Sequence, residues 1–172
     1  EPHRNEGFEW TFSPFPKSRD VARSTRGLLE LIPEGERPTN VGLWEPNTGW
    51  GAEQADYWEE TLSGSGYDVV LREKFQLGSE DFSSLISQSK SQEVEILLSN
   101  PSPPGGITAV NQMEANDFVP KVLKFVRGAD PSAWWSALGQ KGAYACMCPG
   151  WVPGLVGGGN QTFKQSYADE HG

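Results

Sequence analysis

The fold is decided by residues 94–106, which read Val94-Glu95-Ile96-Leu97-Leu98-Ser99-Asn100-Pro101-Ser102-Pro103-Pro104-Gly105-Gly106. The run over 94–98 is almost continuously apolar, which is typical of a strand buried inside a parallel sheet. Proline and glycine then interrupt regular structure, so a loop is expected over 101–106. Apolar residues follow at helical spacing, namely Ile107, Val110 and Met113. A strand, a loop and a helix in this order indicate the repeating unit of an α/β protein.

The same unit repeats on both sides of this stretch. Strands are expected near residues 41, 69, 95, 124 and 145. Further helices are expected over 18–32, over 51–62, around 82–86 behind a cap at Ser79 or Asp81, and from an Asp130 cap with Pro131 at the first helical position to Gly139. Such alternation implies right-handed crossovers. We therefore predict an α/β fold in three layers (α/β/α), with a flavodoxin-like doubly wound parallel sheet in the order 2-1-3-4-5.

Two flanking segments fall outside this repeat. Phe8, Trp10 and Phe12 alternate as they would in a strand, and a last helix is expected from Asn160. The five-stranded sheet needs neither of them, so both indicate connections to another part of a larger protein.

Acidic residues outnumber basic ones. The chain has 14 Lys and Arg residues against 23 Asp and Glu residues, and its formal charge is −9. Nucleic-acid binders normally carry a basic face, and anionic lipid attracts basic segments, so neither partner is expected. No apolar run approaches the roughly 20 residues that span a bilayer, and residues 1–6 lack the apolar stretch of a signal peptide.

Candidate ligand-binding residues follow the predicted strands. Ligands of open parallel sheets bind outside the carboxyl ends of the strands, which places the loops 45–50, 99–106, 127–130 and 149–151 together. Tryptophan offers a flat apolar surface with an N–H donor, Ser and Asn offer short polar groups, and Arg offers a fork for a carboxylate. The candidates are Trp50, Ser99, Asn100, Ser102, Arg127 and Trp151. Alternatively, Trp50 and Trp151 cover the sheet end and Arg127 is a solvated charge.

Groups for catalysis, metal binding or cofactor binding are scarce. The two histidines, His3 and His171, lie at opposite ends of the chain, and no phosphate-binding glycine motif follows a strand. Cys146 and Cys148 are interpreted as small apolar side chains on one strand face, since neighbours at i and i+2 suit neither a disulfide nor a four-ligand metal site. Acidic side chains cluster on the helix at 51–62, where a solvated face is expected: Asp56, Glu59 and Glu60. We expect no enzyme activity, no cofactor and no metal.

Several short pieces, in order and spaced over nearly the whole chain, carry a family resemblance. They are Phe12-Ser13-Pro14-Phe15-Pro16, Asn40-Val41-Gly42-Leu43-Trp44-Glu45 with Gly49-Trp50-Gly51, Gly66-Tyr67-Asp68-Val69-Val70, Asp81-Phe82-Ser83-Ser84-Leu85-Ile86, Asn111-Gln112-Met113, 135–139 and 159–172. The chain resembles the type I periplasmic binding proteins of the branched-chain amino acid (Leu/Ile/Val) ABC transporter family.

The resemblance implies one lobe of a two-lobed protein. Residues 8–150 correspond to the second, ligand-binding lobe, and residues 151–172 to a segment and helix that return toward the absent first lobe, so the chain is either a fragment or a lobe encoded alone. The implied ligand is an amino acid or small carboxylate, which the complete protein passes to an ABC permease. The implied location is periplasmic or extracellular, with a possible lipid anchor on the precursor. Loss of the first lobe implies weak binding and self-association through the exposed cleft face.

The resemblance also refines the candidate site. Trp50 matches the aromatic residue of the family's first-strand turn, and Ser102 or a close neighbour matches a second-lobe contact to the ligand side chain. Val126 or Arg127 falls where the family often has an acidic group that contacts the ligand's ammonium, and a basic Arg127 there favours a carboxylate or an aromatic acid. Two other functions stay open: a ligand-sensing regulatory domain of the same fold, and a flavodoxin-like enzyme or flavin carrier.

Overall fold

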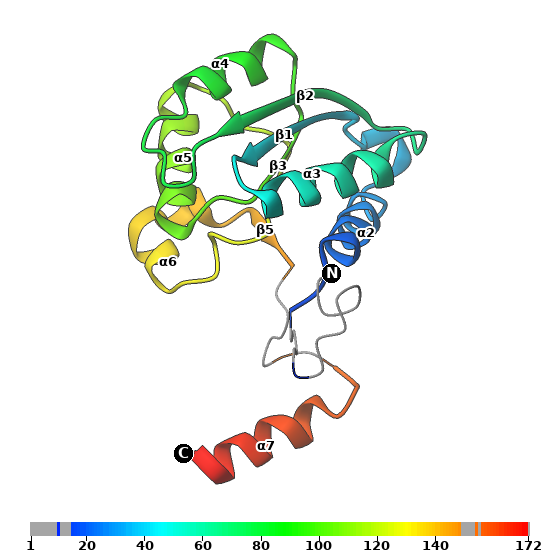
Figure 1. Ribbon diagram of the computed structural model, residues 1–172, viewed down its shortest axis with the longest axis vertical. Coiled ribbons are helices and arrows are strands. Elements are labelled where there is room, and N and C mark those ends of the chain that lie inside the picture. The colour runs from blue at the N-terminus through cyan, green and yellow to red at the C-terminus, as the bar shows by residue number, and fades with distance from the viewer. Residues whose placement is uncertain (1–9, 11–14, 149–153, 155, 172) are drawn as a thin grey trace. The chain divides into compact units, whose positions relative to one another are not determined.

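The computed structural model describes residues 10, 15–148, 154 and 156–171. The chain divides into two compact units, one formed by Pro16–Cys148 and the other by Glu1–Phe15 together with Pro149–Gly172. The larger unit contains the sheet (Figure 1). The smaller unit contains helix α7, Asn160–His171, which confirms the helix expected from Asn160. The strand expected over 8–12 lies outside the described residues, apart from Trp10.

The sheet has five strands in the order β2-β1-β3-β4-β5, and all four neighbouring pairs are parallel. This confirms the predicted doubly wound order. The strands are β1 (Asn40–Pro46), β2 (Asp68–Phe75), β3 (Ile96–Ser99), β4 (Val122–Phe125) and β5 (Ala145–Met147).

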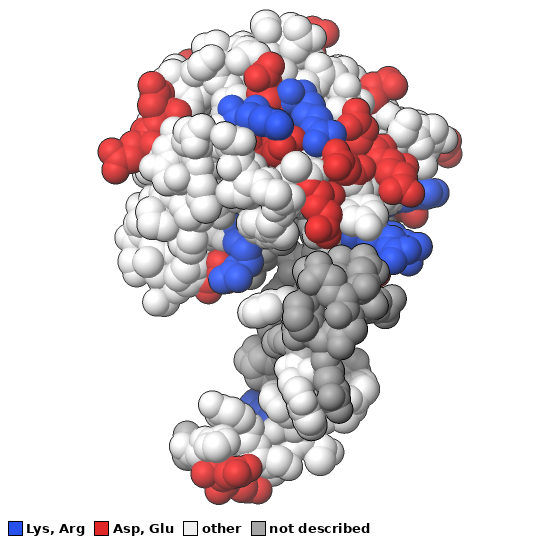
Figure 2. Space-filling model, viewed as in Figure 1, with Lys and Arg blue, Asp and Glu red and all other residues white. Residues whose placement is uncertain are grey.

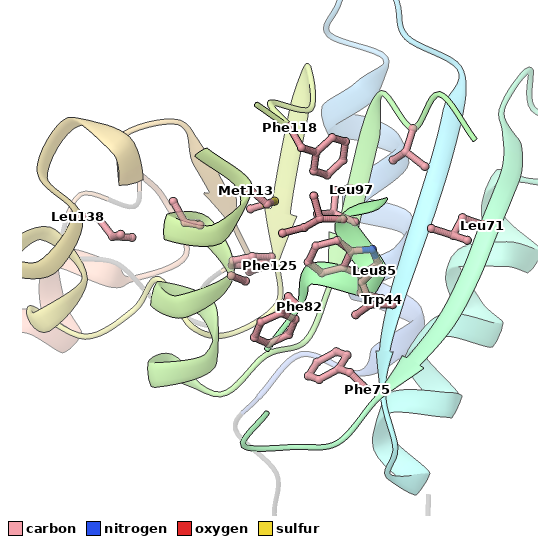
Figure 3. Packing of buried hydrophobic residues seen from close by; sticks show 14 of the residues in the cluster. Trp44, Leu71, Phe75, Phe82, Leu85, Leu97, Met113, Phe118, Phe125 and Leu138 are labelled. Atoms are coloured by element: carbon pink, nitrogen blue, oxygen red, sulfur yellow. The ribbon is translucent and has the colours of Figure 1, made fainter. Parts of the chain in front are cut away.

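Helices cover both faces of the sheet, as the three-layer prediction requires. Alternate residues of β3 belong to separate cores, because successive side chains of a strand point to opposite faces. Ile96 and Leu98 pack in a cluster with residues of α2 and α3. Leu97 packs in a second cluster with residues of α4, α5 and α6, where Trp44 stacks on Phe82 (Figure 3). The helices are α2 (Ser18–Leu29), α3 (Gly49–Leu62), α4 (Ser83–Ser91), α5 (Pro103–Ala115) and α6 (Ala133–Leu138), with short 3-10 turns η1 (Glu34–Glu36) and η2 (Gly139–Gly142).

Three predicted boundaries are wrong. The loop expected over 101–106 is mostly helix, since α5 begins at Pro103 with Ser102 as its N-cap. Proline is tolerated in the first turn of a helix, where its missing N–H would have no partner anyway. Asp130 does not cap α6, which begins at Ala133; its carboxylate instead accepts a hydrogen bond from the Gly128 N–H. The first helix ends at Leu29, three residues before its predicted end.

Candidate functional site

The chain reverses its winding direction between β1 and β3. From β1 it passes into α3, on one face of the sheet, and from β3 into α5, on the opposite face. In doubly wound folds a ligand binds outside the carboxyl ends of the strands at such a switch point. The predicted residues Trp50, Asn100 and Ser102 come from these two connections, so the topology brings them to one edge of the sheet.

Trp50 lies in the first turn of α3, and 42% of it is exposed. Two contacts fix this turn against the end of β1. The Gly51 N–H donates to Thr48 Oγ1 at 3.0 Å, and a Cβ atom on Gly51 would lie only 2.1 Å from the carbonyl oxygen of Pro46. Glycine is therefore required at position 51, and this close approach holds Trp50 at the carboxyl edge.

Ser99 is the last residue of the central strand β3, Asn100 follows it, and both are 1% exposed. Ser99 has a structural role: its Oγ donates to the Trp44 carbonyl at 2.8 Å, and its own carbonyl accepts from the Val126 N–H at 3.0 Å. The side chain of Asn100 is different, because neither Oδ1 nor Nδ2 has a hydrogen-bond partner among the described residues. Buried amides are nearly always hydrogen-bonded, so this side chain has unused capacity to bind a polar group.

The connections that follow β3 and β4 touch each other. Gly128 has a φ of +108°, a conformation that favours glycine, and a Cβ atom there would lie 3.3 Å from Pro101 Cγ. Ser102, next to Pro101, is half-buried and caps α5 by accepting from the Gly105 N–H at 3.4 Å. No residue in the described part of the chain accepts a hydrogen bond from the Ser102 hydroxyl, which is therefore available to donate to a ligand.

Arg127 is already engaged by a carboxylate of its own loop. Its Nε and Nη2 donate to Asp130 Oδ2 at 3.1 and 2.8 Å. Partial burial of Asp130 disfavours its charged form, but hydrogen bonds from the Gly128 N–H and from Arg127 outweigh this and lower the pKa of Asp130. The solvated-charge interpretation of Arg127 is therefore incomplete, and its role toward a ligand stays a prediction. Trp151 lies outside the described residues.

The structure reveals a buried lysine on β4. Lys124 is 2% exposed, and its Nζ donates to Thr25 Oγ1 at 2.7 Å and to Ser24 Oγ at 3.4 Å, both on α2. No carboxylate among the described residues pairs with it. Burial lowers the pKa of Lys124, and the nearby Cys148 and Cys146, which form no disulfide, act in the opposite direction. The apolar run around Lys124 predicts a strand, but the contact with α2 that buries the ammonium group joins residues about 100 positions apart and has no signal in the local sequence.

The acidic face predicted on α3 is only partly solvated. Arg72 of β2 donates Nη2 to Asp56 at 2.7 Å and Nη1 to Glu59 at 2.8 Å, and its Nε donates to the buried Glu45 at 2.9 Å. Burial of the guanidinium lowers the pKa of Arg72, but these three hydrogen bonds outweigh that effect and raise the pKa overall. The network ties α3 to the sheet and leaves Glu60 outside it.

No group of three or more His, Cys, Asp or Glu side chains among the described residues is arranged to hold a metal ion. None of the described helices is both long and apolar enough to cross a membrane.

Comparisons with known proteins agree with this architecture. A family model described as "periplasmic binding protein" matches residues 2–172, so the chain belongs to the periplasmic binding protein family. Similar solved structures include a putative branched-chain amino acid ABC transporter from Rhodospirillum rubrum, with TM-score 0.81, 13% identity and coverage of 99% of this chain and 48% of that one. A counterpart from Silicibacter pomeroyi has TM-score 0.80, 13% identity and coverage of 99% and 44%.

A third similar structure is an ABC transporter solute-binding protein from R. palustris in complex with benzoate, with TM-score 0.73, 15% identity and coverage of 93% of this chain and 43% of that one. At these identities the likeness concerns the fold alone. The chain spans less than half the length of each of the three proteins.

Proposed function

We propose that this chain is part of the solute-binding component of an ABC importer and binds an amino acid or small organic acid without catalysis. Membership of the periplasmic binding protein family supports the binding role. The benzoate complex of the R. palustris protein supports an organic acid as the ligand class. An ABC permease as partner, and a periplasmic or extracellular location with a lipid anchor on the precursor, belong to the same proposal.

The buried amide of Asn100 is the observation that carries this proposal. It lies directly after β3, at the switch point where ligands of doubly wound folds bind. An unpaired buried polar group costs about 1–3 kcal/mol, and a ligand that supplies both a donor and an acceptor would recover this cost. An amino acid carries such groups, and a carboxylate accepts from the amide Nδ2.

The neighbouring residues complement the amide. Trp50 offers exposed ring surface for the apolar part of a ligand. The Ser102 hydroxyl offers one further donor. Arg127 binds a ligand carboxylate by exchanging Asp130 for it, and Asp130 is then available to a ligand ammonium. This pair of opposite charges suits an amino acid as well as an acid.

Replacing Asn100 with leucine, which has nearly the same shape, tests this site. Binding of the ligand is expected to weaken at least about tenfold, because a charge-assisted or polar contact is lost. The free energy of unfolding is expected to stay equal or to rise, since an unpaired amide leaves the core. Titration followed by NMR with benzoate, leucine and phenylalanine measures the first effect, and denaturant unfolding the second. Asn116→Leu, at the opposite end of α5, is the matched control. Unchanged affinity in Asn100→Leu would contradict the site.

The 172-residue chain by itself is expected to bind such ligands no better than millimolar. It covers under half of the similar solute-binding proteins, so contacts from the remaining half are missing. Each polar contact to a charged group contributes about 1.5–3 kcal/mol, and 1.4 kcal/mol is about tenfold in affinity, so two lost contacts turn a micromolar site into a millimolar one. Calorimetry on the isolated chain checks this, and a micromolar ligand would refute it. Self-association through the cleft face, where Trp50 is exposed, stays a prediction.

A further inference from the structure

A concave site lies at the other end of α3, away from the carboxyl edge of the sheet. It is a groove of about 470 Å³ between α2 and the C-terminal half of α3, and Arg19, Arg23, Tyr57 and Glu60 are among its lining residues. This volume falls within the range of about 300–1,000 Å³ that is usual for small-ligand sites.

Three arginines follow one face of α2 in an otherwise acidic protein. Arg19, Arg23 and Arg26 lie at i, i+4 and i+7, and basic side chains gather over this helix in Figure 2. Like charges at this spacing repel each other. Arg26 is paired with Glu30, with 2.7 Å between Nε and Oε1. Arg19 and Arg23 have no acidic partner among the described residues, so two guanidinium groups in the groove are uncommitted.

The opposite wall of the groove carries negative charge. Glu60 has no basic partner among the described residues. Ser63, the C-cap of α3, also lines the groove, and a helix C-terminus presents carbonyl oxygens with a partial negative charge. Tyr57 is half-buried and also lines the groove, and aromatic rings attract cations. The two walls therefore favour opposite charges.

We propose that this groove binds a small zwitterion, with an oxyanion on Arg19 and Arg23 and a primary ammonium on Glu60 and the C-terminal carbonyls of α3. Two arginines one turn apart suit an oxyanion with acceptors on several sides, as a phosphate has. A primary ammonium offers three hydrogen-bond donors to the carboxylate and the carbonyls. Phosphoethanolamine has both groups on a short linker and occurs free or as a lipid headgroup. The site is independent of the solute-binding edge.

Titration of the 172-residue chain with O-phosphoethanolamine, followed by NMR, tests the proposal. Saturable shifts are expected for the amides of Gly27, Ser63 and Ser65, which line the groove. Inorganic phosphate is expected to bind about tenfold more weakly, and ethanolamine more weakly still, because each makes only part of the contacts. Cosedimentation with phosphatidylethanolamine-containing vesicles, but not with phosphatidylcholine vesicles, identifies the headgroup as the source. Binding of the soluble compound alone identifies the free zwitterion.

Substitutions distinguish specific binding in the groove from nonspecific attraction to the charge of the protein. Arg19→Gln with Arg23→Gln is expected to weaken both phosphate and phosphoethanolamine at least tenfold. Glu60→Gln is expected to weaken phosphoethanolamine about tenfold and to leave phosphate equal or tighter. The matched control, Lys90→Gln with Lys141→Gln, removes the same charge elsewhere and is expected to change neither affinity.

A steric variant keeps the test independent of charge. A Cβ atom on Gly27 would meet no other atom within 4 Å, and leucine favours a helix more than glycine does, so Gly27→Leu is expected to fold and to fill the groove. It is expected to abolish the amide shifts at Ser63 and Ser65. Absence of groove shifts in the unmodified chain, retention of binding in Gly27→Leu, or equal losses of both ligands in Glu60→Gln would overturn the proposal.

Discussion

Gly51→Ala is expected to lower the free energy of unfolding by about 2–5 kcal/mol, since it forces overpacking and removes a helix cap. The new methyl group would lie 2.1 Å from the Pro46 carbonyl oxygen and 2.8 Å from Pro46 Cγ. Relief of this clash requires the first turn of α3 to move off β1, which breaks the hydrogen bond from the Gly51 N–H to Thr48. Denaturant unfolding measures the loss, and ligand titration is expected to show weaker binding because Trp50 moves with the turn.

Gly49→Ala is the matched control for this prediction. It lies in the same helical turn, but no atom would lie within 4 Å of its Cβ atom. Its unfolding free energy is expected to equal the parent value or to exceed it by up to about 1 kcal/mol, because alanine favours a helix more than glycine does. Equal stabilities of the two alanine variants would show that β1 does not constrain the start of α3.

Lys124→Met is expected to raise the free energy of unfolding by about 1–4 kcal/mol at neutral pH, the gain seen when buried charges give way to apolar side chains. Burial of the Lys124 ammonium among α2 residues is costly without a carboxylate partner. Removal of the ammonium leaves neither of its hydroxyl partners without a hydrogen bond. Thr25 Oγ1 still donates to the Val21 carbonyl at 2.8 Å and accepts from Trp58 Nε1 at 2.9 Å. Ser24 Oγ still donates to the same carbonyl at 2.8 Å.

The effect of this substitution depends on pH in a defined direction. The pKa of Lys124 is lowered in the folded protein, so between that value and about 10.4 the unfolded chain binds more protons. The stability of the parent protein therefore gains from Lys124 as the pH rises through this window, and below it the penalty is complete. The advantage of Lys124→Met is expected to shrink toward pH 10.

Lys121→Met, three residues away, is the control for pH and for loss of charge. Lys121 is exposed and pairs with Glu95 at the surface, so its loss is expected to cost no more than about 1 kcal/mol. Chemical denaturation of all three proteins across pH 6–10 compares them. A Lys124→Met variant less stable than the parent at neutral pH, or one with a constant difference across the range, would contradict the buried-charge account.

The strand order could be predicted because each strand is a short apolar run and parallel connections have one handedness. The errors at Pro103 and Ala133 share a cause. Proline favours both loops and first helical turns, and the local sequence cannot decide between them. Once the strand order was predicted, it followed that Trp50, Asn100 and Ser102 lie at one edge of the sheet.

Long-range partners could not be predicted in the same way. Arg72 reaches Glu45 only because β1 and β2 pair in one register, with Leu43 opposite Arg72. The pair Arg127 and Asp130 is only three residues apart, so the local sequence favours it. The burial of Lys124, in contrast, depends on how α2 packs across β4. Side-chain burial of this kind follows from packing between elements that are far apart in sequence.

The short last strand has a consequence for the motions of the sheet. β5 has three residues and, among the described residues, pairs only with β4, whereas β1 and β3 have neighbours on both sides. Amide protection against hydrogen exchange follows such differences, since edge segments open locally while central strands open only on global unfolding. Exchange would therefore begin at Ala145–Met147 and spread inward through β4. The half of the carboxyl edge that carries Arg127 and Asp130 then fluctuates first, while Trp50 and Asn100 remain on the most persistent part of the sheet.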